Sequence, residues 1–453
     1  MRLEFDRGTL LLRDLPPEVD AGALPGVLWD PRVGAFRAPA HRRGDLLAAL
    51  GAPDPPPPPV GGWRPVPLRP YQAAALTAWE GAGRRGVVVL PTGAGKTRVA
   101  VAAMAAVDRP TLVLVPTRVL LGQWLAELRR ARAGEVGVLG DGARDVRPVT
   151  VATFESAWRH MSRLGDRFAL LVIDEAHHFG RGLRDEALEM STAPWRLGLT
   201  ATPPADAAPR ARLEALLGPV VFALSVTDLA GRWLAPFEVV TLTLPLDEAE
   251  RAEYEALRRT FLAVARPFFR ARPDAAWTDL LRAARESDAG RRAIVAWRRS
   301  RALLSYTRGK AAALGRLLAR HRAARVLVFT ADNAAAYAVA REHLVMPITC
   351  DVGRAERADA LRRFAAGELR ALVSARVLNE GLDVPDADVG VVVGATQGER
   401  EHVQRVGRLL RPGPGKRALV YELVTPDTAE VHQLARRRAA LAPHPPAPLR
   451  PAR

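Results

Sequence analysis

Short apolar runs alternate with helical patterns over most of this chain. Each run is rich in valine and leucine and is followed by a segment with apolar residues at helical spacing. The runs occupy residues 86–90, 111–115, 149–152, 170–173 and 197–199, and later 325–329, 371–373, 389–393 and 418–423. Continuous apolar runs that alternate with helices are typical of a parallel sheet covered on both faces. The pattern therefore predicts an α/β chain with two similar halves.

The remaining segments suggest how the chain is divided. Residues 1–52 contain short alternating stretches and a helical pattern at 45–50, and residues 53–59 are nearly all proline. Proline fixes φ and lacks an N–H, so this stretch should be an extended, semi-rigid spacer. We predict a small N-terminal domain (1–52), a proline-rich linker (53–62), a first α/β domain (63–240), a helical insertion (241–310), a second α/β domain (311–440) and a disordered tail (441–453).

The helical insertion carries a concentration of arginines. Arg291, Arg292, Arg298, Arg299 and Arg301 surround Trp297. Such a face either contacts nucleic acid or is a solvated helix surface, and the sequence leaves both interpretations open.

Charge and cysteine content narrow the class of protein. The 453 residues carry a formal net charge of +17, with 48% hydrophobic and 25% charged residues. An excess of Lys and Arg favours a polyanionic partner, although a biased genome also produces arginine-rich surfaces. The single cysteine, Cys350, excludes an intrachain disulfide. No signal-peptide pattern and no apolar run near the ~20 residues of a membrane span is present. We expect a cytoplasmic protein that does not enter a membrane.

The segment LPTGAGKT, residues 90–97, is the strongest single motif. It follows an apolar run and begins a helical pattern, which is the context of a phosphate-binding loop. Glycines let backbone N–H groups approach phosphate oxygens, and the helix N-terminus adds positive potential. Lys96 should neutralise the β- and γ-phosphates, and the Thr97 hydroxyl should bind Mg²⁺. The loop residues expected to hold ATP are Thr92, Gly93, Ala94, Gly95, Lys96 and Thr97.

Two further segments complete a phosphate site. The run LLVIDEAHH places Asp174 and Glu175 at the end of a buried strand. We expect Asp174 to hold Mg²⁺ and Glu175 to orient and deprotonate the attacking water. The segment QRVGRLLRP carries Arg405, Arg408 and Arg411, and the last two fall on one helix face. A guanidinium there can stabilise charge developing on the γ-phosphoryl group.

The motifs, taken in order, resemble those of superfamily 2 DEAD/DEAH-type helicases. The matching segments are RPYQ (69–72), PTGAGKT (91–97), VPTRVLLGQW (115–124), VATFES (151–156), DEAH (174–177), GLTATP (198–203), VLVFT (326–330), SARVLNEGLDVP (374–385) and QRVGRLLR (404–411). The resemblance spans about 340 residues. It implies two RecA-like parallel-sheet domains that clamp one ATP between them, with a small N-terminal domain and a helical insertion.

The resemblance also implies a role for each matching residue. Arg69 and Gln72 would read adenine. His177, Thr200 and Thr202 would couple the ATP state to domain movement. The second domain would supply Gly381 and Asp383 beside the nucleotide, and Gln404, Arg408 and Arg411 at the γ-phosphate. The residues expected to line a track for a nucleic-acid strand are Thr117, Arg118, Thr153, Thr330 and Ser374.

Within the superfamily, the chain is most similar to XPB-like proteins. Residues 29–50 are similar to their small damage-recognition-like domain, and the helical insertion takes the place of their thumb-like element. The chain departs from that pattern after Thr202, because TATPPADAAPR lacks the usual Arg-Glu-Asp triplet. That departure puts duplex unwinding in question and keeps a type III restriction-like translocase open.

The resemblance implies an ATP- and Mg²⁺-dependent DNA helicase or translocase that acts in repair or recombination. We expect DNA as the partner, RNA as the less favoured alternative, a possible nuclease or repair partner, and a monomer. A scaffold with a degenerate nucleotide fold is the third alternative. It would have lost catalytic groups, yet Lys96, Asp174, Glu175 and Arg408 are all present.

Overall fold

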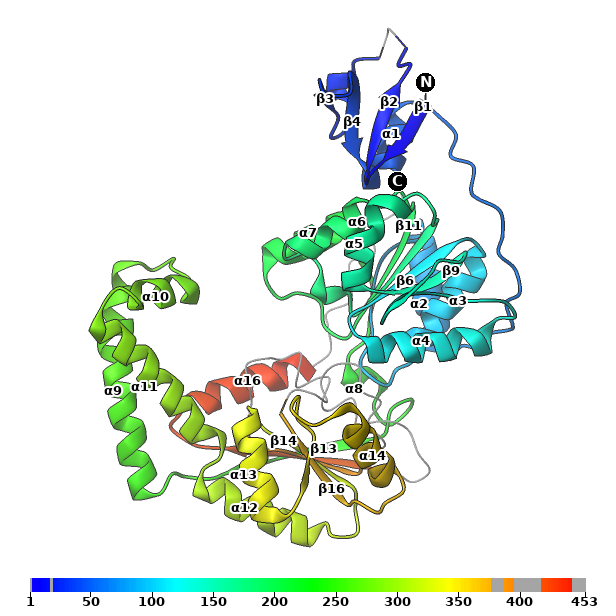
Figure 1. Cartoon of the computed structure of the whole chain (residues 1–453). Coiled ribbons are helices and arrows are strands. Elements are labelled where there is room, and N and C mark those ends of the chain that lie inside the picture. Colours follow the sequence, from blue (N-terminus) through cyan, green and yellow to red (C-terminus); the bar gives the residue numbers. More distant parts are fainter. Residues whose placement is uncertain (1, 17–18, 376–386, 395–416, 442–453) are drawn as a thin grey trace. The chain divides into compact units, whose positions relative to one another are not determined.

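The computed structural model describes residues 2–16, 19–375, 387–394 and 417–441. The chain forms two compact units, one that extends to Leu229 and one that begins at Ala230 (Figure 1). Each unit contains one parallel sheet, and the first also contains a small antiparallel sheet. The predicted α/β class, with two parallel sheets, a small N-terminal domain and a helical insertion, is confirmed.

The small N-terminal sheet is antiparallel with strand order β1-β2-β4-β3. Leu10 and Leu12 of β2 are buried in its core, because alternate residues of a half-buried strand face the same side, and Leu46 of the following helix packs against them. The elements are β1 (Arg2–Asp6), β2 (Thr9–Arg13), β3 (Leu28–Asp30), β4 (Ala35–Pro39) and α1 (Arg43–Ala49).

The first parallel sheet has eight strands in the order β12-β5-β11-β10-β6-β9-β7-β8, and only the β7–β8 pair is antiparallel. Its central strands are buried on both faces, as their apolar runs predict. The strands are β5 (Arg85–Val89), β6 (Thr111–Val115), β7 (Gly137–Gly140), β8 (Ala143–Asp145), β9 (Val149–Thr153), β10 (Leu170–Asp174), β11 (Trp195–Thr200) and β12 (Val220–Ala223). The helices are α2 (Pro70–Gly81), α3 (Lys96–Val107), α4 (Arg118–Ala131), α5 (Phe154–Leu164), α6 (Glu186–Glu189), α7 (Ala207–Leu217) and α8 (Val226–Leu229).

The second sheet is parallel throughout the described residues, with strand order β13-β18-β17-β14-β16-β15. Its first strand, β13, precedes the helical insertion in the sequence, yet pairs along its whole length with β18 near the other end of the chain. The strands are β13 (Phe237–Thr243), β14 (Val326–Phe329), β15 (Met346–Pro347), β16 (Ala371–Ser374), β17 (Val389–Val392) and β18 (Ala418–Val424). The helices that follow the insertion are α12 (Arg308–Arg320), α13 (Asn333–His343), α14 (Arg354–Ala365) and α16 (Ala429–Leu441).

The insertion consists of α9 (Glu248–Ala271), α10 (Trp277–Ala284) and α11 (Asp288–Ser305). Helix α9 packs along α11 (Figure 1), and the rings of Trp277 and Trp297 lie 4.7 Å apart between their centroids. The two ends of the insertion meet, because a Cβ atom built on Gly309 would lie 3.4 Å from the carbonyl oxygen of Pro245. None of the helices in the described ranges is long and apolar enough to cross a membrane.

A buried ion pair joins α12 to the start of α16. The Lys310 ammonium donates to both carboxylate oxygens of Glu430, at 2.7 and 2.8 Å, and to the carbonyl of Leu304 at 2.6 Å. Lys310 is fully buried, and 10% of the Glu430 side chain is exposed. The sequence did not predict this ion pair, because Lys310 and Glu430 lie far apart in the chain and neither belongs to a quoted motif.

Replacing Lys310 with methionine is expected to lower the free energy of unfolding by about 3–5 kcal/mol, because the change leaves the Glu430 carboxylate buried without its cation. Urea unfolding followed by circular dichroism measures the loss. The exposed pair of Arg308 and Asp247, 3.0 Å apart, offers a matched control: Arg308→Met should lower the free energy of unfolding far less than Lys310→Met, because solvent screens the pair. Equal losses in the two variants would contradict the role given to the buried pair.

Candidate functional site

The strand order of the first sheet gathers the sequence motifs at one edge. Parallel strands direct their carboxyl ends to the same side, where ligands bind in open α/β sheets. The phosphate-binding loop follows β5. The TAT segment (residues 200–202) begins with the last residue of β11, and the DEAH segment (residues 174–177) begins with the last residue of β10. Thr117 follows the next strand, β6, and Thr153 is the last residue of β9, which lies beside β6. The predicted ATP site and the predicted nucleic-acid track of this unit therefore share one edge.

The loop between β5 and α3 has the backbone that a phosphate cradle requires. Gly93 and Gly95 have φ of 85° and 78°, a region that residues with a Cβ atom rarely adopt. Gly95 caps α3, which begins with Lys96 and Thr97. A Cβ atom at Gly95 would lie 2.5 Å from the side-chain nitrogen of Gln72, so glycine is also required by the close approach of α2.

Two residues of α2 hold this loop in place. The Tyr71 hydroxyl and the Gln72 side-chain nitrogen both donate to the carbonyl of Ala94, at 2.7 and 2.9 Å. The Gln72 side-chain oxygen accepts the backbone N–H of Arg69 at 2.9 Å. The amide of Gln72 is therefore engaged on both sides within the protein. A cavity of about 450 Å³ opens beside it, lined by Pro67, Leu68, Arg69, Gln72, Gly93, Ala94, Gly95 and Arg98.

The two acids of the DEAH segment lie in different environments. Asp174 ends β10 and is buried, with Oδ1 accepting the backbone N–H of Glu175 at 2.9 Å and Oδ2 accepting the indole N–H of Trp124 at 2.8 Å. Burial, reinforced by the neighbouring Glu175 carboxylate, raises the pKa of Asp174 to about 6. Glu175 has a left-handed backbone, with φ of 51°. Burial alone would raise its pKa, but the nearby His177 side chain and the Lys96 charge together lower the pKa of Glu175 to about 2.

His177 connects the DEAH segment to the TAT segment. Its Nδ1 atom lies 3.1 Å from the Thr200 hydroxyl oxygen and 3.3 Å from Oε2 of Glu175. The Thr200 hydroxyl donates to the carbonyl of Thr202 at 3.0 Å, so His177 must carry the proton on Nδ1 in order to donate to Thr200. The three residues predicted to couple the ATP state to movement thus form one connected relay.

The donor set of this edge fits a magnesium ion. The hydroxyl of Thr97 and the carboxylate of Asp174 are hard oxygen donors, which Mg²⁺ prefers together with phosphate and water. The buried Oε2 atom of Glu175 lies 3.3 Å from Nδ1 of His177 and, among the described residues, makes no hydrogen bond in good geometry, so it can still accept from a water. The Lys96 ammonium donates to the carbonyl of Leu90 at 3.2 Å, at the base of the phosphate loop.

The residues predicted to contact a nucleic-acid strand differ in exposure. Arg118 is exposed and pairs with Asp141 at 3.0 Å, whereas Thr117 is half-buried and caps α4 through Leu120. Thr153 is buried and donates to the Ser156 hydroxyl at 2.9 Å.

The two track residues of the second unit are fully buried. The Thr330 hydroxyl donates to the carbonyl of Asp332, and the Ser374 hydroxyl donates to the carbonyl of Ile348. Their hydroxyl groups are therefore engaged inside the second unit, at the ends of the neighbouring strands β14 and β16.

The remaining predicted residues lie outside the described part of the chain. They are Gly381, Asp383, Gln404, Arg405, Arg408 and Arg411.

The arginines of the insertion fall into two groups. On α11, Arg291 pairs with Asp288, Arg299 pairs with Glu253 at 3.0 Å, and the Arg301 guanidinium lies over the Trp297 ring. These three of the arginines around Trp297 are thus occupied by contacts within the insertion.

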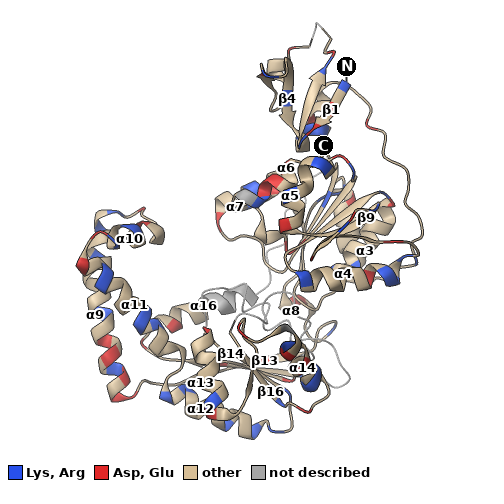
Figure 2. Ribbon diagram, viewed as in Figure 1, with Lys and Arg blue, Asp and Glu red and all other residues tan. Residues whose placement is uncertain are grey.

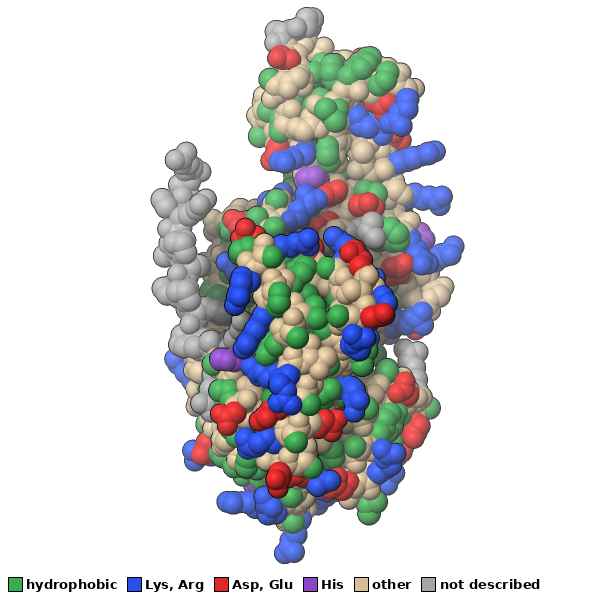
Figure 3. Space-filling view, turned by 90° about the vertical axis from the view of Figure 1, so that its left-hand side faces the viewer, with side chains coloured by type: hydrophobic (Ala, Val, Ile, Leu, Met, Phe, Trp, Pro, Cys, Tyr) green, Lys and Arg blue, Asp and Glu red, His purple; other side chains and the backbone are tan. Residues whose placement is uncertain are grey.

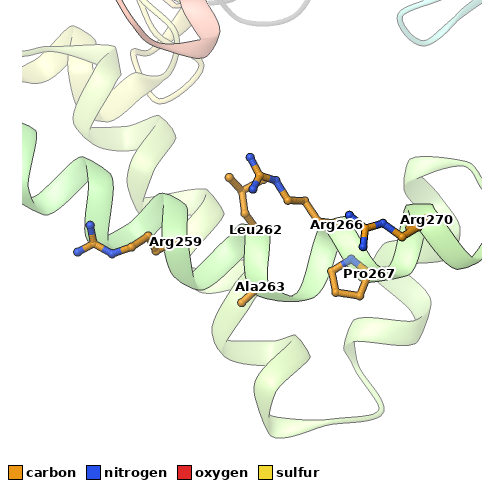
Figure 4. Close-up of a pocket in the computed structure, with 6 residues that line it drawn as sticks. All are labelled: Arg259, Leu262, Ala263, Arg266, Pro267 and Arg270. Carbon is orange, nitrogen blue, oxygen red and sulfur yellow. The ribbon is translucent and has the colours of Figure 1, made fainter.

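Helix α9 presents a different surface. Its first half carries carboxylates and its second half carries arginines, as Figure 2 shows. Arg259, Arg266 and Arg270 are exposed along one side of α9 (Figure 4) and line a groove of about 340 Å³. Arg266 and Arg270 make no ion pair in the described part of the chain. Figure 3 shows Lys and Arg side chains spread over one face of the molecule among hydrophobic and acidic ones.

Sequence reasoning missed two residues that contact the site, Trp124 and Tyr71. Both stand inside quoted motifs, and a buried indole or phenol needs a hydrogen-bond partner. The sequence could have predicted that both side chains need a hydrogen-bond partner. Only the structure shows that the partners are Asp174 and Ala94.

Comparison with known families agrees with this geometry. Residues 65–205 match the family "Type III restriction enzyme, res subunit", and residues 309–413 match the "Helicase conserved C-terminal domain". Residues 3–54 match the "Xeroderma pigmentosum group B helicase damage recognition domain". The fold is similar to the crystal structure of the Pyrococcus furiosus Hef helicase domain, with a TM-score of 0.55 and 17% identity over 82% of this chain and 98% of that one. The fold and the two helicase matches define a superfamily 2 helicase with RecA-like domains.

Relatives with known names identify the family within this superfamily. The chain is 35% identical to DNA 3'-5' translocase XPB2 of Sulfurisphaera tokodaii, over 82% of this chain and 84% of that protein. It is 30% identical to DNA 3'-5' helicase XPB of Mycobacterium tuberculosis, over 84% of this chain and 64% of that protein. The chain belongs to the XPB-like family of nucleotide-dependent helicases. It spans about 55% of a third relative, the Rad25 helicase of Haloarcula marismortui.

Proposed function

We propose that this protein is an ATP-dependent motor that moves along DNA and acts in DNA repair or recombination. The observation that carries the proposal is the shared edge of the first sheet. There, the phosphate loop, the Asp174–Glu175 pair and the His177–Thr200 relay lie beside the first residues of the strand track.

ATP would bind the first unit through the loop from Thr92 to Thr97. Lys96 would leave the Leu90 carbonyl to neutralise the β- and γ-phosphates, while Arg69 and Gln72 would border the base. Mg²⁺, when bound, would neutralise phosphate charge and be held by Thr97 and Asp174. Glu175, ionised at neutral pH because its pKa is low, would orient and deprotonate the attacking water through its Oε2 atom.

Residues of the second domain would complete the site. Gln404, Arg408 and Arg411 would reach the γ-phosphate, with Gly381 and Asp383 beside the nucleotide. ATP would favour a closed arrangement because it contacts groups of both domains, and hydrolysis would remove those bridging contacts. The relay of His177, Thr200 and Thr202 would transmit this change, and backbone contacts on both domains would alternate their grip on a strand.

The polynucleotide preference is testable with matched substrates. ATP hydrolysis by the full chain should be stimulated by single-stranded DNA and less by RNA of the same length and base composition. Greater stimulation by RNA would favour the remodelling alternative instead. A DNA preference is supported by the names of the relatives, which describe DNA helicases and translocases.

Unwinding and bare translocation need separate assays, because the chain lacks the Arg-Glu-Asp triplet after Thr202. Strand displacement on 3′- and 5′-tailed duplexes reports separation and polarity, while triplex displacement reports movement along an intact duplex. Activity in the second assay alone would identify a translocase.

The organisation around this motor is also a proposal. We keep the predicted boundaries at residues 52, 62, 310 and 440, but place the end of the first α/β domain at Leu229 instead of 240, because β13 pairs in the second sheet. We expect a cytoplasmic monomer that works with a nuclease or another repair protein. The matched ranges 3–54, 65–205 and 309–413 support the order of the parts.

We further propose that the α9 groove contacts the DNA backbone. Replacing Arg266 and Arg270 together with serine should weaken DNA binding and lower the slope of log K against log salt by about 1.8, since each lost duplex phosphate contact removes about 0.9. Fluorescence anisotropy at several salt concentrations measures the slope. Arg299→Ser, which breaks only the pair with Glu253, is the control and should leave the slope unchanged. An unchanged slope in the double variant would show that this groove does not contact DNA.

A further inference from the structure

Trp124 contacts the acid that would hold the metal. Its side chain is buried, with 1% of the residue exposed, and its indole N–H donates to Oδ2 of Asp174 at 2.8 Å. The other oxygen, Oδ1, accepts the backbone N–H of Glu175 at 2.9 Å. One neutral donor on each oxygen fixes the rotation of the Asp174 carboxylate and leaves its remaining lone pairs for a ligand.

The helix that carries Trp124 begins at the predicted strand track. Helix α4 follows β6 directly, with Thr117 as its N-cap and Arg118 as its first residue. Thr117 and Trp124 are seven residues apart, which is about two turns and about 10 Å along the helix axis. They therefore lie on the same side of α4, one at its exposed beginning and the other against the sheet.

Because α4 is closely packed, a shift of its first turn would also move Trp124. Leu121, Trp124, Leu125 and Leu128 form one buried stripe on the sheet. A Cβ atom built on Gly140 would lie 3.3 Å from Leu121 and 3.0 Å from Thr153, so the second track residue packs at the same point. Close-packed helices move as bodies, by about 1–2 Å, rather than deforming residue by residue.

We propose that Trp124 is a positioning residue that couples a bound nucleic-acid strand to the nucleotide site. A strand that engages the first turn of α4 would shift the helix and with it the indole donor on Asp174. A movement of about 1 Å is enough to make or break a hydrogen bond of 2.8 Å, because such bonds weaken steeply beyond about 3.2 Å. This inference rests on the proposed function, since it assumes that a strand binds at Thr117 and Arg118.

A purely structural role for Trp124 makes a different prediction. The indole would then serve only to fill the core, and removing its N–H would lower stability without changing how two ligands affect each other. Coupling is a free energy between two sites, and it is measured by comparing the affinity for one ligand with and without the other.

The experiment uses the full chain with Trp124→Phe, which keeps an aromatic ring and removes the donor. The affinity for labelled single-stranded DNA is measured by fluorescence anisotropy with and without Mg²⁺ and a non-hydrolysable ATP analogue. In the wild-type protein, the analogue should change DNA affinity by a factor within about 5–150, the usual range of such couplings. In Trp124→Phe, this factor should fall to about 2 or less, while each ligand alone still binds.

Trp79 offers a matched control in the same unit. It is fully buried, and its indole N–H donates to the backbone carbonyl of Arg196 at 3.0 Å, away from the acids. Trp79→Phe removes an equivalent hydrogen bond and should leave the coupling factor at its wild-type value. Loss of coupling in both variants, or in neither, would overturn the assignment of Trp124.

A measurement on the wild-type protein covers the case in which Trp124→Phe does not fold. The Glu175 amide donates to Asp174, so its hydrogen exchange reports the orientation of that carboxylate. DNA without nucleotide should change exchange in a peptide spanning residues 170–178, and an unchanged peptide would overturn the coupling. If wild-type protein does not bind DNA at all, the proposed function fails. If it binds DNA with coupling that Trp124→Phe retains, only the role of Trp124 fails.

Discussion

Replacing Glu175 with glutamine is expected to lower DNA-stimulated ATP hydrolysis by about 10²–10⁴-fold, the range contributed by a positioned general base. The amide keeps the shape of the side chain but cannot accept the proton of the attacking water. Affinity for ATP should stay close to that of the wild-type protein, because Lys96 and the phosphate loop remain intact. Phosphate release at saturating ATP and DNA measures the rate, and a fluorescent nucleotide measures the binding.

A surface carboxylate provides the control for this prediction. Glu155 is exposed on α5, where it pairs with Arg159 at 2.8 Å, and Glu155→Gln should leave hydrolysis unchanged. Wild-type turnover in Glu175→Gln would remove the assignment of the general base and leave the Asp174–Glu175 pair with a binding role alone.

Arg408→Ala is expected to slow hydrolysis by about 10³–10⁵-fold, the effect of an arginine that stabilises charge developing on the transferred phosphoryl group. ATP binding should be spared, because most contacts to the nucleotide come from the first domain. Arg408 lies outside the described residues, so this prediction rests on the motif QRVGRLLR. Single-turnover hydrolysis at saturating DNA separates the chemical step from product release.

Arg417 gives a control within the second unit. It is exposed and lies 3.7 Å from Glu238, on the neighbouring strand β13. Arg417→Ala should hydrolyse ATP at the wild-type rate. A rate for Arg408→Ala equal to that control would place the stabilising arginine elsewhere in the chain.

Much of the architecture could be predicted because buried parallel strands have a distinctive composition. The run LLVID is apolar until it ends in an acid, so both the strand β10 and the position of Asp174 at its end followed from the sequence. Strand β12 was not predicted: its four residues are all apolar, but so short an apolar run does not by itself distinguish a strand from a helix segment. The order of strands was also beyond the sequence, because it depends on which crossovers pack best.

The site was predictable where one motif supplies neighbouring atoms and was not where separate segments meet. Lys96, Asp174 and Glu175 could be assigned from their motifs. The bond from Trp124 to Asp174 joins residues 50 positions apart, and its existence depends on β6 lying next to β10. The arginines around Trp297 could not be assigned either, because the local sequence does not show that Arg299 pairs with Glu253, 46 residues away.

The meeting of Pro245 and Gly309 has a consequence for how this protein can change over evolution. Strand β13 pairs with β18 and precedes α9 in the chain. Helix α12 begins beside the point at which the insertion starts. The insertion between these two points can be lengthened, shortened or replaced without changing the strand pairing of the second sheet. The helical arm is thus an exchangeable attachment, and its length and surface can diverge among relatives while the sheet that carries it stays constant.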